Sequence, residues 1–187
     1  MPLPDVNCKV LVQNQNTNQK YWLISSPQVY FSDSLISEFV QICNSADILD
    51  MIRCAGVSVT GRYKRRHATS FLNYAAEGWE DQDHFVFFLF TSDSKPKMAG
   101  CFELRNLINQ EFEVGYWIAP KYRGIGTFAL QSLLHQCKIW GMKGAYAKVL
   151  ETNLASIRML TKLKFRKTNQ SAQLPNCGTL LTYRRSL

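Results

Sequence analysis

The chain has 187 residues, of which 46% are hydrophobic and 19% are charged, and its net charge is +8. This composition excludes a disordered chain, because the apolar side chains suffice for a sizeable core. No apolar run approaches the roughly 18 residues that span a bilayer, and the first residues lack the blocks of a secretory signal. We therefore expect one domain over residues 1–187, cytoplasmic and without a membrane partner.

The first half of the chain begins with strand patterns and continues with helical ones. Ser32 is a suitable helix cap, because apolar side chains follow it at helical spacing as far as Cys43. The predicted segments in this half are strands over 8–12 and 21–24, followed by helices over 32–43, 48–54 and 67–79.

From residue 84 the pattern changes to paired strands and then to alternating strands and helices. Turn residues at 92–96 separate two β-rich segments, which predicts a hairpin. Gly141 follows a helical pattern in the way that a helix-ending glycine does. The order predicts an α/β (α+β) domain whose largely antiparallel sheet has one parallel crossover. The predicted segments are strands over 84–90, 98–104 and 111–118, a helix over 127–140, a strand over 145–150, a helix over 155–163 and a strand over 179–184.

Positive charge is concentrated in the last third of the sequence. Residues 1–120 hold 10 Lys and Arg against 13 Asp and Glu, whereas residues 121–187 hold 12 basic residues and one acidic residue. This distribution predicts that the last third meets a polyanion, either a phosphorylated cofactor or nucleic acid.

The six cysteines lie far apart in the sequence. No two of them have CxxC spacing, and none pairs with a histidine at the spacing of metal ligands. We therefore expect reduced thiols and no metal site, as is usual in a cytosolic protein.

The segment 111–127 carries the candidate chemistry. A predicted strand runs into a loop that contains Gly124 and Gly126, and a helix begins at once. Glycines permit close approach and unusual backbone angles, so that consecutive N–H groups can point at one anion, to which the helix dipole adds attraction. Lys121 and Arg123 bring positive charge to the same loop. This construction predicts a pyrophosphate site.

A dinucleotide site is one alternative for this loop. Residues 124–129 fit the GxGxxG/A fingerprint, and Glu151 ends the next predicted strand. A dinucleotide-binding fold needs further strand–helix units, however, and only 36 residues follow Glu151. The dinucleotide interpretation is therefore disfavoured.

These motifs resemble those of the GNAT superfamily of N-acetyltransferases. Residues 121–126 are similar to its acyl-CoA-binding turn, Gln/Arg-x-x-Gly-x-Gly/Ala, with Lys in the first place. Residues 153–165 resemble the Asn-x-x-Ser-x-Arg-x-x-x-Lys-x-Gly-Phe block of the ribosomal-protein alanine acetyltransferase branch, with Lys164 where Gly is usual. Residues 113–117 are also similar to that branch, and the whole resemblance covers residues 98–168.

The resemblance implies a single GNAT-like domain with a mostly antiparallel central sheet, one parallel splayed strand pair and helices on both faces. It implies acetyl-CoA as co-substrate, with its pantetheine arm between the strands 111–118 and 145–150. Helix capping explains Asn153 equally well, and a solvated helix face explains Arg158. The implied cofactor contacts are Trp117, Ile118, Lys121, Tyr122, Arg123, Gly124, Ile125, Gly126, Thr127, Asn153 and Arg158.

The resemblance leaves the catalytic groups less defined than the cofactor contacts. For the general base it favours Glu113, with Glu111, Glu103 or a chain of waters as alternatives. Many family members carry a Tyr seven residues after the Asn to reprotonate the thiolate, but that position is Leu160 here. The branch indicates Ser156 as the substitute, although a hydroxyl at a helix start also bonds the backbone.

The implied function is an acetyl-CoA-dependent N-acetyltransferase, in which a primary amine attacks the thioester directly. The acceptor is a protein N-terminus or a small amine, and nucleic acid is disfavoured as a partner. The alternative is a non-catalytic module on the same fold that binds CoA, RNA or a protein. The oligomeric state stays open, with a homodimer among the alternatives.

Overall fold

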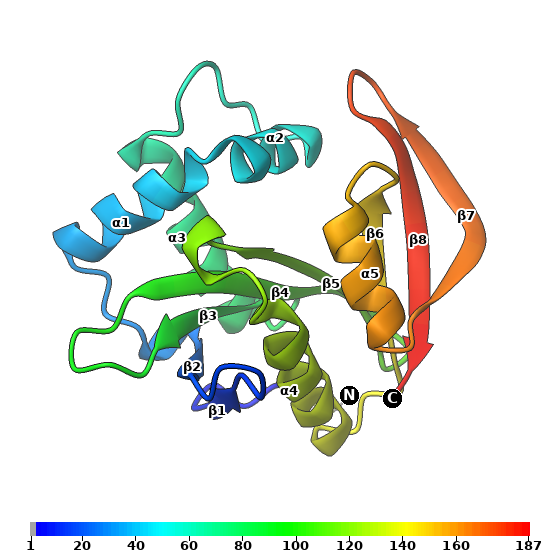
Figure 1. Cartoon of the computed structure of the whole chain (residues 1–187), viewed down its shortest axis with the longest axis horizontal. Coiled ribbons are helices and arrows are strands. Elements are labelled where there is room, and N and C mark those ends of the chain that lie inside the picture. The colour runs from blue at the N-terminus through cyan, green and yellow to red at the C-terminus, as the bar shows by residue number, and fades with distance from the viewer. Residues whose placement is uncertain (1–2) are drawn as a thin grey trace.

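Eight strands form one sheet within residues 3–187, the part of the chain that this computed structural model describes (Figure 1). Their order is β1-β2-β3-β4-β5-β6-β8-β7, and only β5 and β6 run parallel. The predicted class, a mostly antiparallel sheet with one parallel pair, is confirmed. The strands are β1 (Lys9–Gln13), β2 (Lys20–Ser25), β3 (Phe85–Thr91), β4 (Met98–Ile108), β5 (Glu111–Ile118), β6 (Gly144–Leu150), β7 (Arg166–Leu174) and β8 (Gly178–Ser186).

Helices cover both faces of the sheet, as predicted (Figure 1). Ser32 caps the first helix, because its Oγ accepts a hydrogen bond from the Leu35 amide at 3.3 Å. Among the helices of residues 3–187, none has the length and apolar character needed to cross a bilayer. The helices are α1 (Asp33–Cys43), α2 (Ala46–Cys54) and α3 (Arg65–Asp81) on one face, α4 (Gly126–Ile139) and α5 (Leu154–Lys162) on the other, and the short 3-10 helices η1 (Ser26–Gln28) and η2 (Pro120–Tyr122).

The central strand β3 is buried along its whole length. Phe87 and Leu89 pack into the core beneath α4 and α5, whereas Val86 and Phe88 pack into the core beneath α1 and α3. This division follows from the strand period of two, which sends successive side chains to opposite faces. The same alternation holds in β5, in β6 and in β4 from Cys101 to Arg105, but irregular pairing interrupts it on either side of that part of β4.

The parallel strands β5 and β6 separate after three paired positions. Their register runs from Glu111 opposite Gly144 to Glu113 opposite Tyr146, and there it ends. Beyond that point β5 stays paired with β4 as far as Ile118, and β6 stays paired with β8 as far as Leu150. Because each strand follows its outer neighbour, a gap opens between them. The predicted splayed pair is therefore present.

Strand β7 is the one strand of the described chain that the sequence pattern did not predict. Eight of its nine residues are polar or small (RKTNQSAQL), and most of its side chains are exposed. Hydrophobic periodicity therefore gives no signal, and pairing with β8 holds the strand in place.

Lys164 ends α5 in the left-handed backbone region, with φ of +66°. This conformation is the one for which glycine is favoured after a helix, which explains why Gly is usual at this place in the resembling motif. The chain thus keeps the motif's backbone shape with a lysine side chain.

Two cysteines form a disulfide, contrary to the expectation that all thiols are reduced. Cys54 at the end of α2 is bonded to Cys177 in the turn between β7 and β8, with 5.8 Å between their Cα atoms. A sequence separation of 123 residues gives no spacing signal for such a bond. The other four cysteines are free and buried, as small apolar side chains of the core (Cys8, Cys43, Cys101 and Cys137).

Candidate active site

The loop between β5 and α4 presents unpaired backbone amides at the start of a helix. Gly124 has φ of +98°, and a side chain there would meet no atom within 4 Å, so the backbone angle alone accounts for the glycine. Among the hydrogen bonds of residues 3–187, none is donated by the amides of Arg123, Gly124, Gly126 or Thr127. These groups, together with the dipole of α4, make an anion site.

Gly126 allows the start of α4 to approach its neighbours closely. A Cβ at this position would lie 3.0 Å from Met159 Sδ on α5 and 3.1 Å from Ile118 Cγ1 on β5. The glycine therefore brings the loop amides next to the gap between β5 and β6.

The open edge of β5 supplies further amides to the gap. The Ala119 amide donates to the Ala99 carbonyl at 2.9 Å, which fixes the hydrogen-bonding phase of the β4–β5 pair. Because antiparallel partners alternate, the amides of Tyr116 and Ile118 then point away from β4, toward the gap. Two donors aimed at one space can polarise a carbonyl oxygen.

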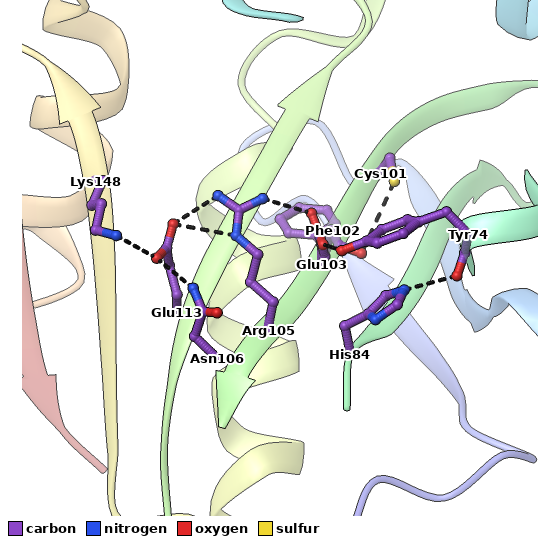
Figure 2. Close-up of polar contacts among 9 residues, drawn as sticks. All are labelled: Tyr74, His84, Cys101, Phe102, Glu103, Arg105, Asn106, Glu113 and Lys148. Carbon is purple, nitrogen blue, oxygen red and sulfur yellow. Dashed lines mark hydrogen bonds and ion pairs between the residues drawn. The ribbon is translucent and has the colours of Figure 1, made fainter. Parts of the chain in front are cut away.

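A row of polar side chains runs from β6 to α3 on the face of the sheet that carries α1 and α3, away from α4 and α5 (Figure 2). Lys148 Nζ lies 2.9 Å from Glu113 Oε2, and Arg105 Nη2 lies 2.7 Å from Glu113 Oε1. Arg105 Nη1 also donates to Glu103 Oε2 at 3.0 Å, and the Tyr74 hydroxyl donates to Glu103 Oε1 at 2.5 Å.

Glu113 is the most deeply buried member of this row, with a side chain that is 3% exposed. Burial acts to raise its pKa, but the hydrogen bonds and positive charges of Arg105 and Lys148 outweigh burial, so that the pKa is lowered. Asn106 Nδ2 also donates to Glu113 Oε2, at 3.1 Å. A carboxylate held in its charged form by four donors is a poor acceptor of a further proton.

Tyr74 is held so that its hydroxyl meets Glu103. Its ring stacks on His84 with 3.7 Å between ring centres, and His84 Nε2 lies 2.7 Å from the Tyr74 carbonyl oxygen. Burial and the hydrogen bond to Glu103 raise the pKa of the Tyr74 phenol, which therefore remains a donor at neutral pH. Glu111, the other alternative base, pairs with Arg184 of β8 instead.

Strand β5, the glycine loop and α4 lie beside a splayed parallel pair of strands. We compared this arrangement with known domains. Residues 32–166 match the family model described as acetyltransferase (GNAT) domain. The chain belongs to the GNAT acetyltransferase family. The predicted superfamily is therefore confirmed, and with it the prediction of an N-acetyltransferase.

Solved GNAT structures share this fold over nearly the whole chain. The Mycobacterium smegmatis RimJ in complex with CoA-disulfide is 15% identical, with a TM-score of 0.73 over 95% of this chain and 86% of that one. An acetyltransferase that modifies the N-terminal serine of ribosomal protein L7/L12 from Salmonella typhimurium is 16% identical, with a TM-score of 0.67 over 95% and 99%. The microcin C7 self-immunity acetyltransferase MccE, in complex with acetyl-CoA and AMP, is 15% identical, with a TM-score of 0.69 over 100% and 99%. A sequence comparison with curated proteins gives no match.

The GNAT motif on α5 places Asn153 and Ser156 at the start of the helix. Asn153 caps α5, because its Oδ1 accepts a hydrogen bond from the Ser156 amide at 3.1 Å. Burial raises the pKa of the Tyr116 phenol to about 12, although a side-chain hydrogen bond with Ser156 acts in the opposite direction. Leu160 is fully buried in the core. The hydroxyls of Tyr116 and Ser156 therefore lie close together, on the face of the sheet that carries α4 and α5.

Several predicted cofactor contacts of this GNAT domain can act only through their backbone. The Trp117 ring stacks on Phe39 of α1 at 5.8 Å, on the face away from α4. Ile125 is fully buried, Ile118 packs against the same core, and the Tyr122 ring meets Tyr21 edge-on at 6.2 Å. The loop thus combines a core-anchored backbone with free amides.

The predicted basic contacts differ in how free their side chains are. Lys121 is exposed, with its Nζ 5.7 Å from the centre of the Tyr122 ring. Arg123 Nη2 lies 2.5 Å from Asp47 Oδ2, which ties the loop to α2. Arg158 is exposed on α5, and no ion pair involves it among the described residues.

The residue that connects Glu113 to Glu103, and the other members of this network, could not be selected from the sequence alone. Glu103 and Arg105 lie two apart, as do Glu113 and Gly115, so the strand period places each pair on one face. The missing information was the register, in which Arg105 lies opposite Glu113 and Glu103 opposite Gly115. The residues that the sequence did not single out are Tyr74, Arg105, Asn106 and Lys148.

The described residues offer no metal site, and their main groove lies apart from the two carboxylates. Within residues 3–187 no three His, Cys, Asp or Glu side chains gather in the way that metal ligands do. A groove of about 1170 Å³ between α1 and the β3–β4 turn reaches Lys121 and Tyr122, but Glu103 and Glu113 do not line it.

Proposed function

We propose that this protein transfers the acetyl group of acetyl-CoA to a primary amine, and that the acceptor is the N-terminal amine of a protein. The observation that carries the proposal is the gap between β5 and β6, which begins at Glu113 and lies beside a loop with unpaired amides. Together they offer a diphosphate site and, next to it, a slot for a thioester arm.

The loop residues suit the diphosphate of coenzyme A. The amides of Arg123, Gly124, Gly126 and Thr127 and the positive end of α4 can hold its phosphate oxygens, and exposed Lys121 adds charge. The amides of Tyr116 and Ile118 can then stabilise the oxyanion that forms when an amine attacks the thioester carbonyl. The hydroxyl pair Tyr116–Ser156 can protonate the departing thiolate.

A protein N-terminus suits direct attack better than a lysine side chain does. An α-amino group has a pKa of about 7.7–8.0, whereas a lysine has a pKa of about 10.4, so that more of the α-amine is neutral near pH 7.5. The solved ribosomal acetyltransferase from Salmonella typhimurium, which shares the fold, is described as modifying an N-terminal serine. Both points favour the N-terminal amine over a lysine side chain.

Calorimetric titration with CoA tests the cofactor site. Lys121→Ala should weaken binding roughly 5- to 10-fold, the effect of one charge on a phosphate, and should reduce the salt dependence of the dissociation constant. Lys138→Ala is the matched control, because Lys138 is exposed at the far end of the same helix. Equal affinities for the two variants would remove the Lys121 side chain from the cofactor site.

A panel of acceptors tests the reaction. We expect acetyl-CoA turnover with peptides that have a free N-terminus, and none with the same peptides blocked at the N-terminus and carrying one lysine. Turnover of polyamines alone would overturn the proposed acceptor. CoA binding without turnover of any acceptor would instead favour a non-catalytic module.

A further inference from the structure

Two carboxylates reach the same face of the sheet near the gap, and they differ in how many donors they already hold. The Glu113 carboxylate accepts from four donor atoms. They are Nε and Nη2 of Arg105, at 3.3 and 2.7 Å, and the side-chain nitrogens of Asn106 and Lys148. A carboxylate has about four lone-pair sites, so Glu113 is fully occupied. Glu103 has two donors, Tyr74 and Arg105, and each of its oxygens keeps one free site (Figure 2).

The Glu103 carboxylate has more room around it, and is more exposed, than the Glu113 carboxylate. Glu103 is opposite Gly115 in the β4–β5 register, where the neighbouring strand has no side chain. A Cβ at Gly115 would still lie 3.7 Å from Glu103 Oε2 and from Arg105 Nη1. The Glu103 side chain is 13% exposed, against 3% for Glu113.

The position of Glu103 along the strands also favours contact with an acceptor. Glu113 lies at the last rung between β5 and β6, at the closed end of the gap. Gly115 lies two residues further along, next to the Tyr116 amide that points into the gap. Because neighbouring strands are about 4.8 Å apart, Glu103 on β4 lies one strand away from that amide.

The two substrates then come from opposite faces. The α4 loop and α5 lie on one face, whereas Glu103, Arg105 and Tyr74 lie on the face that carries α1 and α3. An acyl group that passes through the gap meets an amine on the Glu103 face.

We infer that Glu103 binds the ammonium group of the acceptor and takes its proton, and that Glu113 acts through Arg105 as a positioning residue. The inference rests on the proposed acetyl transfer. One ammonium proton passes to a Glu103 oxygen and then to solvent, and the neutral amine attacks the thioester carbon. As the C–N bond forms, the C–S bond breaks. The Tyr116–Ser156 hydroxyl pair gives a proton to the thiolate and regains the second proton of the nitrogen, which gives amide and thiol.

Charged and titratable groups surround Glu103 on several elements. Arg105 is the only positive charge that contacts it directly among the described residues. The others act at longer range or through hydrogen bonds. The groups are Cys101 and Arg105 on β4, Tyr74 on α3, His84 before β3, Glu113 on β5 and Lys148 on β6.

The pH dependence of Glu103→Gln tests the assignment. At pH 7 kcat/KM for a peptide acceptor should fall roughly 100-fold, the usual effect of losing a general base. Above pH 9 the loss should shrink to about 10-fold or less, because an α-amine with a pKa of about 8 is then already neutral. Affinity for CoA should not change. A pH profile parallel to the parent's would overturn the assignment.

The variant Glu113→Gln tests whether Glu113 positions Arg105 or itself takes the proton of the acceptor. We expect a loss of kcat/KM that is constant across pH, because Glu103 remains to take the proton. Recovery at high pH in this variant, with none in Glu103→Gln, would reverse the two roles. A parent protein that acetylates no acceptor would refute the proposed function before either variant is compared.

Tyr74→Phe provides a variant that keeps Glu103 and removes one donor. Loss of a hydrogen bond to the charged carboxylate should move the acidic limb of the pH profile to higher pH. Glu77→Gln, exposed one turn along α3, is the control and should leave the profile in place. An acidic limb that stays at the parent's pH in Tyr74→Phe would contradict the role of Glu103.

Discussion

Leu160 fills the place where many GNAT members carry the tyrosine that protonates the departing sulfur. Its side chain is fully buried in the core, whereas the hydroxyls of Tyr116 on β5 and Ser156 on α5 lie close together on the face that carries α4 and α5. Under the proposed function, these two hydroxyls take the role of that tyrosine. A scan for the family's tyrosine at its usual spacing cannot detect such a change.

We predict that Ser156→Ala lowers kcat roughly 10- to 100-fold while the KM for acetyl-CoA stays the same. A general acid commonly contributes about 100-fold or more, and a thiolate needs less help than a poorer leaving group. Steady-state kinetics with a fixed peptide acceptor measure the effect. Thr161→Ala, exposed on the same helix, is the control. Equal rates for the parent and Ser156→Ala would exclude the hydroxyl from the reaction.

Glu113 should stabilise the fold in a pH-dependent way. Its folded-state pKa lies below the ordinary value, so its contribution is present above the unfolded pKa and is lost as pH falls through the folded pKa. Glu113→Gln should therefore cost about 3 kcal/mol of unfolding free energy at pH 7, because Lys148 then loses its acidic partner and Arg105 keeps only Glu103. The difference from the parent should shrink below about pH 4. Urea titrations at several pH values measure both, and a pH-independent difference would contradict the ion-pair origin.

At the scale of elements, the segments with strong periodicity were predictable. Ser32 caps α1 as expected, and β5 has the predicted bounds. Strand β7 was missed, because its polar sequence has no buried face and pairing with β8 alone defines it. The gap between β5 and β6 came from family resemblance, since strand separation depends on the outer partner of each strand and leaves no mark in local sequence.

The end of α5 offers a test of backbone strain. Lys164 has φ of +66°, a conformation that costs a residue with a Cβ about 1 kcal/mol and costs glycine little. Lys164→Gly should therefore raise the unfolding free energy by about 0.5–1 kcal/mol, after allowance for the greater freedom of unfolded glycine. Lys164→Ala is the control, because it shortens the side chain and keeps the Cβ. A gain in both variants would assign the effect to the side chain instead.

At the scale of the whole molecule, long-range links decide how the site is held together, and the sequence did not predict them. Helix α2 is joined to the cofactor loop by the Asp47–Arg123 ion pair and to the β7–β8 turn by the Cys54–Cys177 disulfide. The residues of each link lie far apart in the chain, at separations of 76 and 123. Charge and cysteine patterns identify groups able to bond, but only the fold selects the partners.

The disulfide should stabilise the molecule chiefly by restricting the unfolded chain. Closing a loop of this length contributes about 2–4 kcal/mol, which corresponds to roughly 5–15 °C in melting temperature for a chain of this size. The double variant Cys54→Ser/Cys177→Ser should melt lower than the parent by that amount. Adding dithiothreitol should bring the parent down to the variant's value and leave the variant unmoved, because the free thiols of the described chain are buried. If dithiothreitol does not change the melting temperature of the parent, the disulfide contributes nothing to stability.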